Sequence, residues 1–521
     1  MLRGAGGTYA APVHGTVMPD GRVLLIGEER PSLTSKAGEQ AWAAIIAPAA
    51  AADPLPSEMT VPSLKMPLDV HNTPFGPYLV TDDLLCSGHT LTANGAFFSA
   101  GGTRTISNPT TQYLQVTAPS YATSYDGTNW TRVPADMIAA SHGEPRRWYP
   151  TVTRLPDSRL LVTSGADQVL PSPSYNLTSE AYDPTTGAWT VFSMADPLEI
   201  MNVDYTHVFA LPAPAHGLLL FGEAGVPVLS SGTANGVWAV RTVPRPGSEQ
   251  WNADRLAGSW NRDTAPNFGA SSAMLPLRVA NGAWGYYNGS VLMAGGELAG
   301  AVSSKVDVYD PFKDAWRPTL DTQIHRHHPS TVLLPDGKVL VIGGHSTDPG
   351  VRQAEYVDPR NGFSVAIGTT DSGEVRGYHT VDLLLPDGRV LVAGGRDIVT
   401  ATSIEKPSLR YYSPPYMTAT RPELFSVPAG IGFGQNFFVD SIGATPAEIV
   451  LIGLGSMTHS FDSNQRYVQL ITGQPISAGN GYWRTVTTGP SDSLAAPPGY
   501  YMLFVVDAQG IPSKAKIIHV G

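Results

Sequence analysis

One short unit recurs along the chain and limits what it can fold into. In the copy at 381–395, two apolar runs flank the turn Pro386-Asp387-Gly388, and the second run ends in Gly394-Gly395. Two apolar runs around a Pro-Asp-Gly turn predict a β-hairpin. We recognise about seven copies, a self-similarity that predicts a repeat architecture. Their second runs end at Gly27, Gly102, Gly165, Gly222, Gly296, Gly344 and Gly395.

A second signature follows several copies of this hairpin. Tyr182-Asp183-Pro184 precedes Trp189, and Tyr309-Asp310-Pro311 precedes Trp316. A hairpin, a glycine pair and a later Tyr/Trp pair are typical of a kelch-type repeat, in which each repeat forms a four-stranded blade. The sequence therefore predicts an all-β chain with a seven-bladed kelch-type β-propeller over residues 1–418.

The repeats stop at Ser413-Pro414-Pro415-Tyr416, where the proline pair indicates a rigid linker. Residues 419–521 instead show short runs of alternating polarity, and about 100 residues of this pattern predict an immunoglobulin-like β-sandwich. We expect strands at 436–439, 448–452, 466–470 and 500–506.

Three segments within the repeats lack a clear pattern of their own. The alanine-rich stretch Ala41–Ala52 contains Pro48 and is expected to be a loop. Residues 113–130 are expected to supply outer strands of the second blade. Residues 235–270 have the polar composition of a surface loop.

The hairpin turns define a register for the residues that precede them. Blades place their innermost strand along a central channel, so one register predicts one height in that channel. Four chemically useful side chains stand nine positions before the last turn residue: Cys86, Tyr149, His328 and His379. Tyr378 neighbours His379 and can reach the same cavity. The alternative is a structural ring of polar side chains. His325 and His327 lie beside His328, but alternation of side chains along a strand argues against one metal site for all three.

The composition limits the classes of molecule that the chain is expected to bind. The net charge is −11 and no basic run is present, which argues against nucleic acid and anionic membrane surfaces. No run of 18 apolar residues predicts a membrane span, and no signal peptide is recognised. The single cysteine, Cys86, excludes an internal disulfide and could equally be a small buried hydrophobic residue.

Four short motifs contain chemically useful side chains. They are Cys86 before the second hairpin, Trp148-Tyr149 before the third, Tyr378-His379-Thr380 before the last and Thr458-His459-Ser460 in the sandwich region. Together these motifs resemble the galactose oxidase and glyoxal oxidase family of copper radical oxidases. The run Cys86-Ser87-Gly88-His89 is more similar to the glyoxal-oxidase-like members.

The resemblance implies a set of site residues. His379 and His459 would be imidazole ligands of one copper ion, Tyr149 an equatorial phenolate ligand and Tyr378 the axial one. Cys86 would be joined to the ring of Tyr149 by a self-formed thioether that holds a radical. Tyr378 would accept the substrate hydroxyl proton, so that Cys86, Tyr149 and Tyr378 are the catalytic residues.

The resemblance also implies an activity. The substrates would be O2 and small aldehydes, which as hydrates are oxidised by two electrons to carboxylic acids, with H2O2 as the second product. We expect a secreted monomer, extracellular or at the cell surface. An aromatic side chain shields the radical in some members, and the candidates here are Trp148, Trp251, Trp260 and Phe268.

Three alternatives remain. The enzyme could oxidise primary alcohols to aldehydes, as galactose oxidase does. A kelch propeller could also serve as a non-catalytic module that binds proteins or glycans, because fold alone does not decide function. A hydrolase ranks last, since the sequence contains no paired-carboxylate motif. His89, next but two to Cys86, is expected to be structural.

Overall fold

The structure is a computed structural model. It describes residues 2–3, 7–32, 40–48, 59–60, 68–73, 76–82, 84–108, 113–138, 145–167, 176, 178–194, 205–213, 217–223, 237–244, 250–256, 269–298, 301–346, 349–371, 374–396 and 405–521. Strands dominate these residues, and their helical structure is confined to three short 3-10 turns, η4 (Pro349–Arg352), η5 (Pro359–Asn361) and η6 (Pro415–Thr418). The all-β prediction is therefore confirmed.

Each copy of the repeated unit forms an antiparallel hairpin. The pairs are β2 (Tyr9–Val17) with β3 (Val23–Arg30), β8 (Gly88–Leu91) with β9 (Phe97–Ala100), β14 (Thr151–Arg154) with β15 (Leu160–Thr163), β18 (His207–Leu211) with β19 (Gly217–Glu223), β22 (Ala270–Met274) with β23 (Val291–Gly295), β28 (His327–Leu333) with β29 (Val339–His345) and β32 (Tyr378–Leu384) with β33 (Val390–Arg396). The first strands of neighbouring hairpins pack against one another, β22 on β28, β28 on β32 and β32 on β2.

Outer strands extend all seven hairpins into sheets. They are β4 (Gln40–Ile46), β12 (Ala122–Tyr125), β13 (Trp130–Arg132), β16 (Ser179–Asp183), β17 (Ala188–Met194), β20 (Val237–Pro244), β21 (Gln250–Leu256), β26 (Val306–Asp310), β27 (Ala315–Pro318), β30 (Gln353–Asp358), β31 (Ser364–Asp371) and β34 (Leu409–Tyr412). The Tyr/Trp signature is a cross-strand pair, because Tyr182 lies opposite Trp189 and Tyr309 opposite Trp316. Such aromatic pairs stabilise a sheet. Closure of the sheets into a seven-bladed propeller stays a prediction.

Three sequence expectations were wrong. Within Ala41–Ala52, residues up to Ile46 belong to strand β4, which is paired with β3 and largely buried. Within 235–270, β20 and β21 form a hairpin. Backbone pairing with a partner strand overrides the weak β-propensity of alanine and polar residues in these segments.

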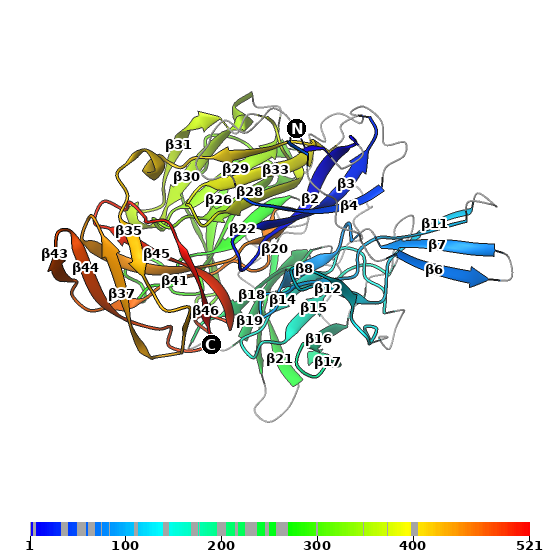
Figure 1. Ribbon diagram of the computed structural model, residues 1–521, viewed down its shortest axis with the longest axis horizontal. Coiled ribbons are helices and arrows are strands. Elements are labelled where there is room, and N and C mark those ends of the chain that lie inside the picture. The colour runs from blue at the N-terminus through cyan, green and yellow to red at the C-terminus, as the bar shows by residue number, and fades with distance from the viewer. Residues whose placement is uncertain are drawn as a thin grey trace.

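The third correction concerns residues 113–130, of which only the later part extends the second hairpin. Strand β11 (Tyr113–Thr117) belongs instead to a separate sheet, in the order β11-β10-β7-β6. Its other strands are β10 (Arg104–Asn108), β7 (Gly76–Asp82) and β6 (Leu68–Thr73), and the sheet extends from the right of the molecule in Figure 1. Short strands are β1 (Leu2–Arg3), β5 (Met59–Thr60), β24 (Glu297–Leu298) and β25 (Ala301–Val302).

The C-terminal region forms two sheets that share a buried core, as a sandwich requires. One contains β35 (Glu423–Ser426), β37 (Asn436–Ile442), β42 (Ile471–Thr472), β43 (Ile476–Gly479) and β44 (Tyr482–Thr488). The other contains β36 (Gly430–Ile431), β38 (Pro446–Gly453), β41 (Tyr467–Gln469), β45 (Gly499–Asp507) and β46 (Lys516–Val520). The four strands expected from the sequence are all present.

A hairpin from this region enters the repeats. Strand β39 (Ser456–Thr458) pairs with β2 and with β40 (Phe461–Asp462), and it also contacts β8 and β32. Thr458 lies opposite His14 of β2. His459, in the turn between β39 and β40, is therefore buried among the first strands of the repeat hairpins.

Candidate metal centre

The residues at the heads of the hairpins share an unusual backbone conformation. Their φ angles are 61° at Cys86, 62° at Tyr149, 48° at Tyr205, 53° at His328 and 68° at His379. A positive φ is strained for residues other than glycine, and such residues cluster at functional sites. The nine-residue register of the sequence thus corresponds to a shared backbone geometry.

Backbone hydrogen bonds join these positions between neighbouring hairpins. The N–H of Tyr149 donates to the carbonyl of Cys86, and the N–H of Tyr205 donates to the carbonyl of Tyr149, both at 2.9 Å. The N–H of His328 donates to the carbonyl of Gly269 at 2.8 Å, and Gly269 also has a positive φ of 73°. Tyr149, Tyr205 and His328 are therefore each held by the hairpin before them.

Two phenols meet at the centre of the site. The hydroxyl oxygens of Tyr149 and Tyr378 lie 2.5 Å apart. Burial of its hydroxyl raises the pKa of Tyr149 well above the usual value, and Cys86, Tyr378 and Tyr205 raise it further. The Cys86 thiol also makes a hydrogen bond with Tyr149 that acts in the same direction. The sulfur consequently lies within hydrogen-bonding reach of the phenol oxygen.

His459 completes the group from the C-terminal side. Its ring centroid is 5.0 Å from those of Tyr149 and Tyr378 and 4.5 Å from that of His379. Nδ1 lies 2.6 Å from Thr458 Oγ1, whereas the buried Nε2 has no hydrogen bond within the described part of the chain. Burial, with His379 and His14 nearby, holds the pKa of His459 well below its usual value. The neutral ring can therefore offer the Nε2 lone pair to a metal.

His379 is oriented by a carboxylate that the sequence analysis missed. Its Nδ1 lies 3.0 Å from Oε1 of Glu405, which is buried and also lies 3.5 Å from Arg396 Nη1. Metal-binding histidines commonly donate one ring N–H to a carboxylate, which directs the other nitrogen at the metal. No spacing or repeat signal in the sequence links Glu405 to His379.

The residues present fit a copper ion. Two imidazole nitrogens and two phenol oxygens form the type of donor set that suits Cu(II). His379 and His459 are buried, whereas Tyr149 and Tyr378 are partly exposed.

Two aromatic rings cover Tyr149. Trp148 stacks on it with centroids 4.0 Å apart and planes at 16°, and Tyr205 lies at 4.8 Å. Tyr205 also stacks on His459 at 4.3 Å and donates its hydroxyl hydrogen to the carbonyl of Ser87. Among the shielding candidates, Trp260 and Phe268 lie outside the described residues, and only the backbone of Trp251 is described.

Tyr205 was missed although a signal existed. It stands two residues before strand β18, just as Cys86 and Tyr149 stand two residues before β8 and β14. Applying that offset to the fourth hairpin would have found it.

Further histidines surround the group. The N–H of Cys86 donates to His14 Nε2 at 3.2 Å, and His89 Nδ1 lies 2.7 Å from Ser456 Oγ. Burial lowers the pKa of His89 to about 3. These contacts fix the Cys86 backbone and the β39 hairpin, which agrees with a structural role for His89.

The histidines before β28 divide into two environments. His325 is exposed, whereas His327 is buried and His328 lies 5.0 Å, centroid to centroid, from the ring of Tyr378. Burial and the neighbouring imidazoles of His327 and His345 hold the pKa of His328 well below its usual value. His328 therefore approaches the site, as its register predicts, but from beyond Tyr378.

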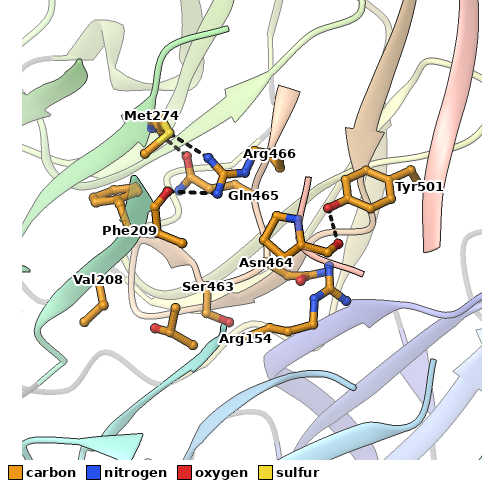
Figure 2. A pocket seen from close by; sticks show the side chains of 12 residues that line it. Arg154, Val208, Phe209, Met274, Ser463, Asn464, Gln465, Arg466 and Tyr501 are labelled. Carbon is orange, nitrogen blue, oxygen red and sulfur yellow. Dashed lines mark hydrogen bonds between the residues drawn. The ribbon is translucent and has the colours of Figure 1, made fainter. Parts of the chain in front are cut away.

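A separate pocket lies where the repeats meet the sandwich (Figure 2). Its walls include Arg154, Phe209, Met274, Arg466 and Tyr501, and none of the candidate metal ligands lines it. Arg466 donates to the carbonyl of Ala210 at 2.8 Å.

In the part of the chain that the structure describes, no helix has the length and apolar character needed to cross a membrane.

Comparison with known proteins gives four findings. The family described as "Galactose oxidase-like, Early set domain" matches residues 421–520. "Aldehyde oxidase GLOX1" of Arabidopsis thaliana is 26% identical over 502 residues, covering 87% of this chain and 74% of that protein. "Galactose oxidase" of Gibberella zeae is 31% identical over 205 residues, 37% of this chain and 29% of that protein.

A solved structure also shares the fold. It is titled "Novel fungal alcohol oxidase with catalytic diversity among the AA5 family, in complex with copper", and it matches with a TM-score of 0.65 over 98% of this chain and 97% of that one, at 17% identity. The sequence relatives, the C-terminal family match and this fold agree with the motifs that the sequence analysis singled out. The chain is therefore similar to the galactose oxidase and glyoxal oxidase family, as its motifs indicated.

Proposed function

We propose that the chain is a copper radical oxidase that converts small aldehydes, as their hydrates, to carboxylic acids and reduces O2 to H2O2. The observation that carries this proposal is the convergence of Tyr149, Tyr378, His379 and His459, with the Cys86 thiol beside the Tyr149 phenol. The relatives named aldehyde oxidase favour aldehydes as substrates.

The chain supplies one-electron chemistry of its own through Cys86 and Tyr149. A thioether forms when the thiol S–H and an ortho C–H of the ring are replaced by a C–S bond, and O2 accepts the two electrons and two protons. Sulfur donates electron density to the ring, so the cross-linked Tyr149 loses one electron more readily than an ordinary tyrosine.

Copper, when held by Tyr149, Tyr378, His379 and His459, would supply the second one-electron couple and a position for the substrate oxygen. Glu405 keeps His379 in the orientation and tautomer that ligation needs. Tyr378 accepts the substrate hydroxyl proton as general base. The cross-linked Tyr149, once it has lost one electron, would accept the hydrogen atom from the substrate carbon. Trp148 and Tyr205 exclude water from the faces of the Tyr149 ring.

The overall reaction balances with one O2 for each hydrate, RCH(OH)2 + O2 → RCOOH + H2O2. The second candidate is RCH2OH + O2 → RCHO + H2O2, because galactose oxidase is among the relatives and the matching structure is an alcohol oxidase. We also propose that residues 1–418 form the seven-bladed propeller, that 419–521 supply His459, and that the protein is an extracellular or cell-surface monomer.

A peroxide-coupled assay tests the proposal. The copper-loaded protein is offered a panel of small aldehydes and a matched panel of primary alcohols, and we expect H2O2 with aldehydes first. Cys86→Ser should abolish peroxide formation but still bind copper, because the four ligands remain. Exposed His325→Ala is the matched control and should behave as wild type. Peroxide formation that survives Cys86→Ser, or none from either panel, would contradict the proposal.

A further inference from the structure

A second group of imidazoles lies outside the four proposed copper ligands. His327 and His328 begin strand β28 and His345 ends β29, which places His327 opposite His345 across the hairpin. One ligand nitrogen from each of the three lies within 4.8 Å of the others. The sequence analysis rejected a site made of His325, His327 and His328, and the structure replaces exposed His325 with His345.

Two distances from His327 match the spacing of donor atoms around a metal ion. His327 Nδ1 lies 3.0 Å from His345 Nε2 and 3.3 Å from Glu297 Oε2. Tetrahedral zinc with ligand bonds of about 2.0–2.1 Å sets neighbouring donor atoms about 3.3 Å apart. We propose that His327, His328, His345 and Glu297 bind a second divalent transition-metal ion, Zn²⁺ or Cu²⁺, two of the ions that imidazole ligands suit.

Burial and charge support this assignment. His327 and His345 are 8% and 3% exposed, and the buried Nδ1 of His328 has no hydrogen bond among the described residues. A buried polar atom that makes no hydrogen bond is costly. The carboxylate of Glu297 contacts the cluster and would offset part of the charge of a divalent ion.

Two glycines make room for the rings. A Cβ added at Gly377 would lie 2.3 Å from His345 Nδ1, and one at Gly269 would lie 2.1 Å from His327 Cδ2. Real Cβ atoms do not approach other atoms this closely, so both positions require glycine while the imidazoles keep these places. Gly377 directly precedes Tyr378 and His379 in the sequence. The close approach of the His345 ring explains why a glycine stands at this position.

The second site would share a wall with the first. The ring of Tyr378 lies 5.0 Å from the rings of both His328 and His459. A cation on the His328 side would favour the ionised form of Tyr378. This consequence rests on the proposed function, whereas binding of the second ion does not.

Metal counting tests the inference. The protein is equilibrated with Co²⁺ and then with Zn²⁺, freed of excess metal, and its metal-to-protein ratio is measured by mass spectrometry. We expect wild type to hold one ion more than His345→Ala and His327→Gln, and the control His325→Ala to match wild type. The variant His459→Ala lacks one ligand of the proposed copper site but retains the histidine cluster. We therefore expect this variant to bind one ion in the cluster and, when that ion is Co²⁺, to show the visible spectrum of tetrahedral Co²⁺.

The outcomes separate the two sites. Equal metal content in wild type and in folded His345→Ala and His327→Gln would overturn the second site without touching the first. If neither variant folds, the His459→Ala chain decides, because Zn²⁺ must raise its melting temperature by mass action. No shift with Zn²⁺, together with no tetrahedral Co²⁺ spectrum, would likewise overturn the inference.

Discussion

At the scale of single residues, strain and chemistry coincide. The left-handed residues at the hairpin heads each carry a backbone cost of about 1–3 kcal/mol. They are Cys86, Tyr149, Tyr205, His328 and His379. Their side chains all lie in or next to the group of phenols and imidazoles. A ring of polar side chains with a purely structural role would not require positive φ angles at these residues. The strain is therefore best understood as the means of turning these side chains toward one centre.

Glu405 gives the first prediction at this scale. Glu405→Gln weakens the charge-assisted hydrogen bond to His379 and should lower copper affinity by about 10–100-fold. Competition with a chelator measures the change. Glu374→Gln is the matched control, since Glu374 pairs with Arg376 rather than with a ligand. The melting temperature must be followed in parallel, because Glu405 also lies near buried Arg30. A folded variant with wild-type copper affinity would show that Glu405 does not position His379.

The second prediction at this scale concerns proton release on copper binding. The raised pKa of Tyr149 means that its phenol is protonated at neutral pH, so ligation as phenolate must expel a proton. The lowered pKa of His459 means that this ring is already neutral there and adds no proton. Copper affinity should therefore rise with pH, by about tenfold per pH unit for one proton released. Titration calorimetry in buffers of different ionisation enthalpy counts the protons, and an affinity that stays flat between pH 6 and 8, about one unit either side of neutrality, would refute phenolate ligation.

At the scale of elements, the β39–β40 hairpin determines whether a site can form at all. Its Ser456 Oγ lies 2.9 Å from Thr16 Oγ1 and 2.7 Å from His89 Nδ1, so one buried hydroxyl ties the hairpin to β2 and β8. Together with the pairing of β39 and β2, these contacts fix the depth at which His459 stands.

Removal of that hydroxyl tests the role of the hairpin. Ser456→Ala leaves buried polar groups of Thr16 and His89 without this partner, which should cost about 1–3 kcal/mol of unfolding free energy. Urea denaturation measures the loss, and Ser426→Ala, on the exposed part of β35, is the control with little expected change. Equal stability of the two variants would mean that the hairpin is held by other contacts.

The elements also show how far the sequence could lead. The hairpins followed from the turn chemistry, and the Tyr/Trp signature from the cross-strand pair that it forms. The register located Cys86, Tyr149, His328 and His379 because one backbone geometry repeats at each hairpin head. The sheet of β6, β7, β10 and β11 was missed because its strands are separated along the chain and repeat no pattern. Glu405 and His345 were missed because their contacts arise only from tertiary packing.

At the scale of the whole molecule, the proposed ligands come from distant parts of the chain. Tyr149 precedes the third hairpin, Tyr378 and His379 begin the last, and His459 enters from the C-terminal region, which lies on the left in Figure 1. Cys86 stands before the second hairpin, so its bond to Tyr149 would link two neighbouring repeats covalently. Folding must therefore bring the repeats and the C-terminal hairpin together before the cofactor can form.

The most direct test of the central claim is the intact mass of the protein after exposure to copper and O2, with peptide mapping of the product. The account predicts a chain two hydrogen atoms lighter than its sequence requires, with one cross-linked peptide pair that contains Cys86 and Tyr149. Cys86→Ser should keep its sequence mass under the same treatment. An unmodified wild-type mass, with Cys86 recovered as a free thiol, would contradict the account.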